Sequence, residues 1–344
     1  MILEWVLKSV VIILFGLTGF AYTTYYERRF LARIQVRIGP NRAGPWGLLQ
    51  PVADGIKLIF KEELVPDNAY KLAFMLSPVI TMVPAIVVMG VLPWGGTIEA
   101  LNLDLSLANI NVGILYILSV TSISVYGLVL AGWSSNNKYA MLGGLRSTAQ
   151  MISYELSLGL AFLGPVIMAG SMNMFDIVKF QHAHPLTWAA VQFLGAVIFF
   201  IAMVAEINRA PFDMPEAEQE LVAGYHTEYS GMKFALFFMG EYVKMVAVAA
   251  IFITLFWGGF AGPGVGINEI SVFGWFTFDG DWLGPLYYFL KIFIVLGIMI
   301  WVRATLPRFR YDRLMAFGWK VLLPLALFNV FLVAVLTFYF FPAV

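Results

Sequence analysis

The chain has 344 residues, of which 60% are hydrophobic and only 12% are charged, and its mean hydropathy is +0.83. Soluble globular domains are much less apolar, so this composition predicts an integral membrane protein. The chain has no cysteine, which excludes disulfides and thiolate ligation of iron–sulfur clusters within it. None of its three histidines lies in an apolar span, so the ligands of a membrane haem are also lacking and no metal site is predicted.

Eight runs of about 20 apolar residues match the thickness of the hydrocarbon core of a bilayer. The predicted transmembrane helices are 2–26, 71–93, 110–132, 148–169, 187–206, 233–257, 284–304 and 318–341. The first run is predicted to be a retained helix, because Glu4 lies near its start and no small-residue cleavage site precedes Glu27. The predicted fold class is therefore an all-α polytopic membrane protein with a single membrane domain over residues 1–344.

The loop after the first span combines turn residues with an amphipathic segment. Gly39-Pro40-Asn41 and Gly44-Pro45 predict a constrained turn. Within 47–63, apolar and charged residues separate at helical spacing, with Leu49, Val52, Ile56, Ile59 and Phe60 on one side and Asp54, Lys57 and Lys61 on the other. This segment is too short and too polar to span a bilayer, so an interfacial amphipathic helix is predicted. Its connection to an arginine-rich turn suggests docking against another protein.

Charged side chains inside apolar spans are costly, so they normally face a bundle interior, a partner or water. They are Glu155 in the fourth span, Glu206 at the end of the fifth, Glu241 and Lys244 in the sixth, and Lys291 in the seventh. Glu241 and Lys244 are three residues apart and share a helix face, so they could form an ion pair. The alternative explanation is a structural pair, or a long side chain that reaches the interface.

The loop 207–232 concentrates acid between two apolar spans. Its carboxylates are Asp213, Glu216, Glu218, Glu220 and Glu228. Ordinary solvation of a loop is the simplest explanation. Clustered carboxylates also repel one another and share protons, so they titrate as a group and can pass on a change of charge.

The turn between the last two spans, RATLPRFRYDRLM, is rich in arginine. Its arginines are Arg303, Arg308, Arg310 and Arg313. Membrane orientation and contact with phospholipid explain most of this charge. Arg303 is the exception, because it lies at the end of a span, where an acidic partner would stabilise it.

The distribution of cations predicts the orientation of the chain. Seventeen of the 21 Lys and Arg residues fall in or beside the loops after spans 1, 3, 5 and 7. The loops after spans 2, 4 and 6 hold one, Lys179. Because cytoplasmic loops carry the excess of cations, the odd-numbered loops are predicted to be cytoplasmic and both termini to lie outside.

Four stretches resemble the signature motifs of one family of membrane proteins. They are ERRFLARIQVRIGPNRAGPWGLLQPVADGIKLIFKE, SNNKYAMLGGLRSTAQMISYE, EINRAPFDMPEAEQELVAGYHTEYSGMKFALFFMGEY and RATLPRFRYDRL. In order and position they are similar to the H subunit (mitochondrial subunit 1) of the proton-pumping NADH:quinone oxidoreductase, respiratory complex I. The similarity extends across the whole chain, and the outer loops are its least characteristic part.

The resemblance implies an eight-helix heel of the membrane arm, with a cytoplasmic-side interfacial helix and with spans 2–6 resembling half of an antiporter-like subunit. In the family, a narrow quinone chamber is built from the first span, the interfacial helix, the sixth span and the first cytoplasmic loop. The chamber residues that carry over by motif are Glu27, Arg28, Arg37, Asp54, Lys57 and Phe60.

The resemblance also implies a chain of acids that leads from the chamber into the membrane. It carries over to Asp213, Glu216, Glu218, Glu220, Glu228, Glu206, Glu155 and Glu241. A quinone that takes up two electrons needs nearby proton donors or a field that responds to its charge. These acids are therefore the expected route for coupling quinone reduction to proton translocation.

The resemblance implies partners and a location as well. Quinone is the expected substrate, and no cofactor is expected to be bound permanently by this chain. FMN and the iron–sulfur clusters are expected in partner subunits, including the peripheral subunits that hold the terminal cluster and the quinone head-group site. The other expected partners are small neighbouring membrane-arm subunits and lipids, but no nucleic acid. The expected location is the bacterial cytoplasmic (inner) membrane.

Two other functions stay open at this point. The corresponding subunit of a membrane-bound hydrogenase, a formate hydrogenlyase or a ferredoxin-dependent relative shares the fold, although the stretch RIGPNRAGP and the helix after it favour a quinone chamber. A stand-alone proton-coupled transporter would be expected to show broken helices and internal repeats around a midplane site. Such a transporter would also leave the basic first loop unexplained.

Overall fold

The computed structural model of the chain describes residues 2–98, 103–213, 224–265, 270–272, 276–278 and 282–340. Within these residues, eight helical stretches are long and apolar enough to cross a membrane. They are α1 (Ile2–Ile34), α3 (Lys71–Met89), α4 (Gly113–Ser134), α5 (Lys138–Ala169), α7 (Pro185–Glu206), α9 (Gly231–Phe256), α10 (Leu283–Thr305) and a last stretch of α11 (Tyr311–Phe317), the π-helical turn η5 (Gly318–Leu322) and α12 (Leu323–Phe340). The predicted all-α polytopic fold is confirmed.

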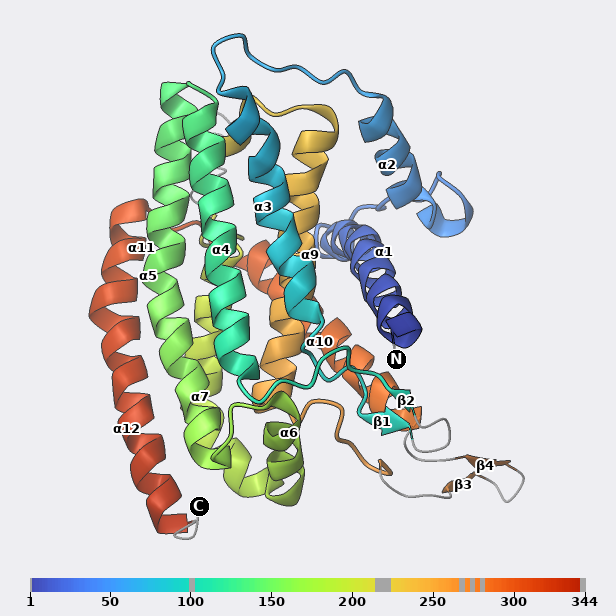
Figure 1. Ribbon diagram of the computed structural model, residues 1–344, viewed down its shortest axis with the longest axis vertical. Helices are drawn as coiled ribbons and strands as arrows, with labels where there is room; N and C mark the ends of the chain where they lie inside the picture. Colours follow the sequence, from blue (N-terminus) through green and yellow to red (C-terminus); the bar gives the residue numbers. More distant parts are fainter. Residues whose placement is uncertain are drawn as a thin grey trace.

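Short elements connect the spanning helices. The helical ones are η1 (Pro45–Gly47), α2 (Gln50–Phe60), α6 (Met174–Ala183) and η3 (Gly224–His226). Two antiparallel hairpins, which hydropathy did not predict, pair β1 (Thr97–Ile98) with β2 (Leu103–Asp104) and β3 (Ile270–Val272) with β4 (Phe276–Phe278). In the first hairpin Thr97 pairs with Asp104, and in the second Ile270 pairs with Phe278. Both hairpins lie at the end of the bundle opposite α2 (Figure 1).

Two spanning helices are longer than the apolar runs that predicted them. α1 continues to Ile34, beyond residue 26, and α5 begins at Lys138, ten residues before residue 148. With 32 residues, α5 is about 48 Å long at 1.5 Å per residue, which exceeds the roughly 30 Å hydrocarbon core. Its first turn begins outside the apolar run, where the Asn137 Oδ1 accepts a hydrogen bond from the Tyr139 amide at 2.9 Å. Hydropathy marks only the apolar part of such a helix.

The helices form a bundle with α9 near its centre. Figure 1 shows α3, α4 and α5 side by side, with α11 and α12 on one flank and α1 with α2 on the other. Every residue of α9 from Tyr242 to Phe256 is buried. α3 and α4 approach closely because Gly127 has no side chain, since a Cβ there would lie 2.2 Å from Thr81 Oγ1.

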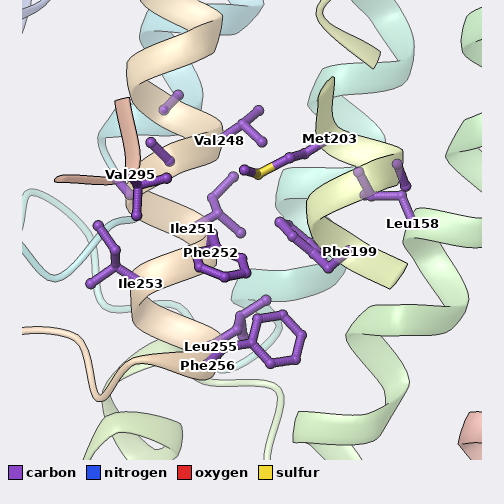
Figure 2. Close-up of a cluster of buried hydrophobic side chains, with 14 of the residues drawn as sticks. Leu158, Phe199, Met203, Val248, Ile251, Phe252, Ile253, Leu255, Phe256 and Val295 are labelled. Carbon is purple, nitrogen blue, oxygen red and sulfur yellow. The ribbon is translucent and has the colours of Figure 1, made fainter. Parts of the chain in front are cut away.

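The hydrophobic core joins α5, α7, α9 and α10. Figure 2 shows Phe199 of α7 reaching toward the part of α9 that carries Phe252 and Phe256. The ring centroid of Phe199 lies 6.0 Å from that of Phe252 and 5.4 Å from that of Phe256, distances typical of favourable aromatic pairs. This packing fixes the position of α9, the helix that also carries Glu241 and Lys244.

A lysine from α10 closes the end of α9 that lies away from the acidic loop. The Lys291 Nζ donates to the carbonyl oxygens of Trp257 at 2.9 Å, Gly259 at 2.8 Å and Ala261 at 2.8 Å. Trp257 is the C-cap of α9 and the other two carbonyls belong to the loop that follows, so this cation holds the loop against the helix end and complements the negative end of the helix dipole. Lys291 is therefore a cap for α9, a role that its sequence position alone did not indicate.

Candidate functional site

A cavity of about 400 Å³ lies between α1, α2 and α9. Among its lining residues are Phe20 and Arg28 of α1, Asp54 and Lys57 of α2, and Met239 and Tyr242 of α9. Most of the wall is apolar, and the charged side chains come from α1 and α2. An apolar cavity with a few convergent polar groups is typical of a site for a mostly apolar ligand with a polar head. We refer to it as the α1–α2–α9 cavity.

An ion pair at the edge of the α1–α2–α9 cavity joins its two charged helices. The Arg28 Nη1 lies 2.5 Å from the Asp54 Oδ2, and the Gln50 Nε2 donates to the Asp54 Oδ1 at 3.1 Å. Both Arg28 and Asp54 line the cavity together with Lys57. Three of the six predicted chamber residues are thus brought to one cavity, where a charge-assisted hydrogen bond orients Arg28 and Asp54.

The other three predicted chamber residues lie elsewhere. Glu27 points into the helix bundle and is buried. The Arg37 Nε donates to the Gln35 Oε1 at 2.8 Å on the exposed first loop. Phe60 ends α2 with 84% of its surface exposed. None of these three lines the α1–α2–α9 cavity.

The first loop is held against α1 by an arginine and exposes apolar side chains. The Arg29 Nη1 donates to the Tyr25 hydroxyl at 2.6 Å and to the Trp46 carbonyl at 2.5 Å. Val36, Ile38 and Trp46 are nevertheless 94%, 81% and 75% exposed. A fixed loop that presents large apolar side chains to its surroundings is typical of a protein interface.

Behind the α1–α2–α9 cavity, four charged side chains from four segments form a cluster in which Glu27 and Arg209 are buried and Arg303 is partly exposed. We call it the Arg209 cluster. The Arg209 Nη1 donates to the Glu27 Oε1 and Oε2 at 2.9 and 3.0 Å, and its Nε contacts the Glu241 carboxylate. Arg303 contacts Glu27 from α10. The Arg209 guanidinium also lies over the Tyr242 ring, 4.2 Å from its centroid. Tyr242 is a wall of the cavity, so the cluster lies directly behind that wall.

The Arg209 cluster contains two carboxylates and two guanidinium groups. Burial alone would lower the pKa of the Arg209 guanidinium, but the neighbouring carboxylates of Glu241 and Glu27 outweigh burial and raise that pKa above its ordinary value. Arg209 therefore stays charged. Its charge is what allows Glu27, which is only 3% exposed, to be buried.

A second ion pair and a small polar cavity lie deeper in the bundle. The Lys244 Nζ lies 3.0 Å from the Glu206 Oε1. Glu206, Glu241, Lys244 and Ser124 line a cavity of about 30 Å³, enough for one or two water molecules in a polar setting. The predicted pair between Glu241 and Lys244 is not formed. The two side chains instead reach different partners, because Arg209 and Glu206 approach α9 from other elements.

Glu155 continues this line of polar groups on α5. Its carboxylate accepts a hydrogen bond from the Ser122 hydroxyl on α4. It also lies within electrostatic reach of Glu206 and Lys244. Glu155 is therefore close enough to Glu206 and Lys244 to influence them, and Glu206 shares the small cavity with Glu241.

The loop acids are spread more widely. Asp213 lies near Glu241 and 3.8 Å from the Arg308 guanidinium. The Glu228 Oε1 accepts from the Asn137 Nδ2 at 2.7 Å, at the start of α5. The predicted residues Glu216, Glu218 and Glu220 lie outside the described residues.

Sequence reasoning missed Arg209 and Tyr242. The signal for Arg209 was a cation three residues after Glu206, at the end of an apolar span. Its burial depends on how α1, α9 and α10 meet around it, which spacing along one segment does not reveal. The acidic partner expected for Arg303 is Glu27.

His226 is a buried histidine within the acidic loop. Its ring lies 4.9, 5.5 and 6.3 Å from the rings of Tyr225, Phe234 and Phe238. Burial lowers the pKa of the His226 imidazole to about 4. The imidazole is therefore neutral in the folded protein at neutral pH.

Acid is expected to loosen the segment around His226. An unfolded histidine has a pKa of about 6.5, so between pH 6.5 and 4 the opened segment binds a proton that the folded one excludes. The contribution of neutral His226 to the free energy of opening this segment is fully present above pH 6.5. It falls by up to about 1.4 kcal/mol per pH unit as pH drops toward 4.

Amide hydrogen exchange at residues 224–230, corrected for intrinsic rates, should accelerate between pH 7 and pH 5, and His226→Phe should weaken this response. The exposed-site control, His182→Gln, should keep it. Equal acid responses in His226→Phe and the unsubstituted protein would contradict the assignment.

The comparisons with known proteins agree on one family. The sequence profile described as NADH dehydrogenase matches residues 7–334. The chain is 49% identical over 322 residues to the H subunit of the NADH-quinone oxidoreductase of Protochlamydia amoebophila, covering 93% of each chain. It is 48% identical over 322 residues to that of Rickettsia typhi, covering 93% of this chain and 89% of the relative. It is 50% identical over 336 residues to the H subunit of Deinococcus deserti, and the match covers 96% of this chain and 82% of the relative.

Proposed function

Because this chain belongs to the NADH dehydrogenase family and is a membrane subunit of respiratory complex I, we propose how its own residues serve that complex. The α1–α2–α9 cavity receives the quinone, and the Arg209 cluster behind it couples quinone reduction to proton movement. The observation that carries this proposal is their adjacency, since Tyr242 is both a wall of the cavity and the ring on which Arg209 lies.

The shape and charge of the α1–α2–α9 cavity suit a quinone. Its apolar wall accepts the isoprenoid tail, and Arg28, Asp54 and Lys57 provide polar contacts for the head as it passes. Electrons come from partner subunits that hold FMN and iron–sulfur clusters. The exposed side chains of Val36, Ile38 and Trp46 are the surface on which a peripheral subunit docks and completes the chamber.

Coupling proceeds through the charges behind the chamber. Reduction of the quinone changes the charge beside Tyr242, and the Arg209 cluster transmits that change to Glu241. The water-sized cavity then links Glu241 to Glu206 and Lys244. Glu155 and Ser122 extend the path toward α4 and α5. Acids within electrostatic reach titrate as a group, so a proton accepted at one changes the affinity of the next.

The orientation follows from the distribution of cations. We place the chain in the bacterial inner membrane with α2 and the acidic loop in the cytoplasm and with both termini outside. The chain has no native cysteine, so a single cysteine at Asn136 can be labelled selectively. Labelling of that cysteine only from the periplasmic side would contradict this orientation.

The names of the relatives favour quinone reduction over the alternatives. The relatives from Protochlamydia, Geobacter and Rickettsia are all named as the H subunit of an NADH-quinone oxidoreductase. A hydrogenase or ferredoxin-dependent complex would use the same coupling groups with a different electron donor. A stand-alone transporter would give no role to the exposed first loop.

Asp54→Asn tests the chamber. The substitution keeps the shape of the side chain but removes the charge that pairs with Arg28. A charge-assisted hydrogen bond contributes about 1.5–3 kcal/mol, so quinone reductase activity of the assembled complex should fall about tenfold or more. Ferricyanide reduction, which the peripheral subunits perform, should be unchanged.

The matched control is Asp312→Asn, which removes a carboxylate that is 72% exposed and paired with an exposed arginine. Both activities should survive in this control. The chamber assignment would be contradicted if Asp54→Asn lowered the two activities equally in an assembled complex, or if it left quinone reduction unchanged.

A further inference from the structure

A second large cavity, of about 480 Å³, lies between α7, α10 and α11. Representative lining residues are Phe200 and Val204 of α7, Val302 of α10, Leu306 just after α10, and Arg313 and Phe317 of α11. It shares no lining residue with the α1–α2–α9 cavity. The proposed function therefore makes no use of it. We call it the α7–α11 cavity.

The α7–α11 cavity has an apolar wall and one charged lining residue. That residue is Arg313, and the rest of the lining is apolar. Arg313 is exposed and makes no ion pair within the described residues. The segment 303–320 around it carries five Lys and Arg residues and one acid, Asp312. Arg303, Arg308 and Arg310 contact carboxylates, so the positive charge available at the cavity is that of Arg313.

The position of the cavity matches the boundary of a bilayer. It lies where α10 ends at Thr305 and where the last spanning stretch begins at Tyr311. Phe309, which is 44% exposed, lies in this turn, and aromatic residues are enriched at membrane interfaces. The apolar wall thus faces the level of the acyl chains, and Arg313 lies at the level of the head groups.

We propose that the α7–α11 cavity binds an anionic phospholipid. Its acyl chains fill the apolar volume, and its phosphate accepts hydrogen bonds from Arg313. Charge complementarity selects this occupant, because a neutral apolar helix or tail would leave the Arg313 guanidinium without an anion at the head-group level. Basic side chains near a membrane surface attract anionic lipid in this way.

The bound lipid would also support the loop that carries Arg209. Pro211 and Phe212 line the α7–α11 cavity two and three residues after Arg209. The Phe212 carbonyl accepts from the Gln150 Nε2 at 2.7 Å, and its ring stacks 5.7 Å from that of Phe309. An occupied cavity therefore packs against the same short segment from its outer side.

Photocrosslinking in the assembled complex tests the site. The complex is placed in phosphatidylcholine nanodiscs with a trace of phosphatidylglycerol that carries a diazirine on its acyl chain. Labelled peptides should contain residues 200–212 and 302–317. Unlabelled phosphatidylglycerol should compete at least several-fold better than unlabelled phosphatidylcholine. Arg313→Gln should lower labelling of these peptides about tenfold, as expected for the loss of a charge-assisted hydrogen bond.

Arg310→Gln is the matched control, because Arg310 carries the same charge in the same turn but is 79% exposed and does not line the cavity. Its labelling should equal that of the unsubstituted complex. Equal competition by the two lipids, or equal labelling in Arg313→Gln, would overturn the proposal. So would an absence of lipid labelling together with protein crosslinks from these residues to another subunit. The lipid competition uses the unsubstituted complex, so the test does not depend on assembly of the variant.

Discussion

Arg209→Gln is expected to cause the largest loss of assembled complex among the single substitutions considered. The Arg209 guanidinium contacts both Glu27 and Glu241, and it is almost wholly buried. Removing one member of a buried ion pair leaves an uncompensated charge and costs about 3–5 kcal/mol. Native gels of solubilised membranes should show much less complex, and the remaining complex should unfold at a lower temperature. Arg33→Gln, a substitution at an exposed arginine of α1, should have no such effect.

A double substitution separates the charge effect from simple loss of packing. Arg209→Gln with Glu241→Gln removes one positive and one negative group, which leaves Arg303 beside Glu27. If unpaired charge causes the damage, the double variant should assemble better than Arg209→Gln alone, with a coupling energy of about 1–3 kcal/mol. Purely additive losses would show that the Arg209 cluster acts through packing and not through compensated charge.

The overall fold could be predicted because a bilayer restricts the choice of structure. A chain in hydrocarbon must satisfy its backbone hydrogen bonds internally, so long apolar runs become spanning helices. The sequence did not show where α1 ends or where α5 begins. Their extensions, up to Ile34 and down to Lys138, are polar enough to leave the membrane and still remain helical. Hydropathy measures the solvent that a residue prefers, and helix ends depend on capping and packing as well.

The carboxylates of the candidate site and Lys244 could be found in the sequence, but Arg209 and the pairing between these charges could not. Glu241 and Lys244 share a helix face, and that spacing made a pair between them plausible. In the structure, Glu241 instead pairs with Arg209, and Lys244 pairs with Glu206. The choice depends on tertiary contacts between α9, α7 and the loop that follows α7. The resemblance led us to expect a chamber between α1, α2 and α9, where the first cavity lies. The α7–α11 cavity was not expected, because it forms only where α7 packs against the later segments α10 and α11.

The double variant Glu155→Gln with Glu241→Gln is expected to uncouple or stop the pump. Glutamine keeps the shape of both side chains but cannot release a proton, and both carboxylates lie in spanning helices along the proposed path. Losing a positioned proton-transfer group typically slows a reaction by about 100-fold or more. Turnover should therefore fall, and the protons translocated per quinone reduced should fall in the turnover that remains. The measurement uses sealed membrane vesicles with equal amounts of assembled complex.

Glu155→Gln alone distinguishes a relay from a structural role. Glu155 accepts from Ser122 and makes no salt bridge within the described residues, whereas Glu241 holds Arg209 and its loss also disturbs that cluster. A glutamine at 155 still accepts the Ser122 hydrogen bond, so assembly and thermal stability should be nearly unchanged while pumping declines. Glu62→Gln, at an exposed acid beyond α2, serves as the matched control and should pump normally. If the Glu155→Gln complex turned over at the normal rate with an unchanged ratio of protons to quinone, Glu155 would not carry protons, and the path from the Arg209 cluster would have to end at Glu206 and Lys244.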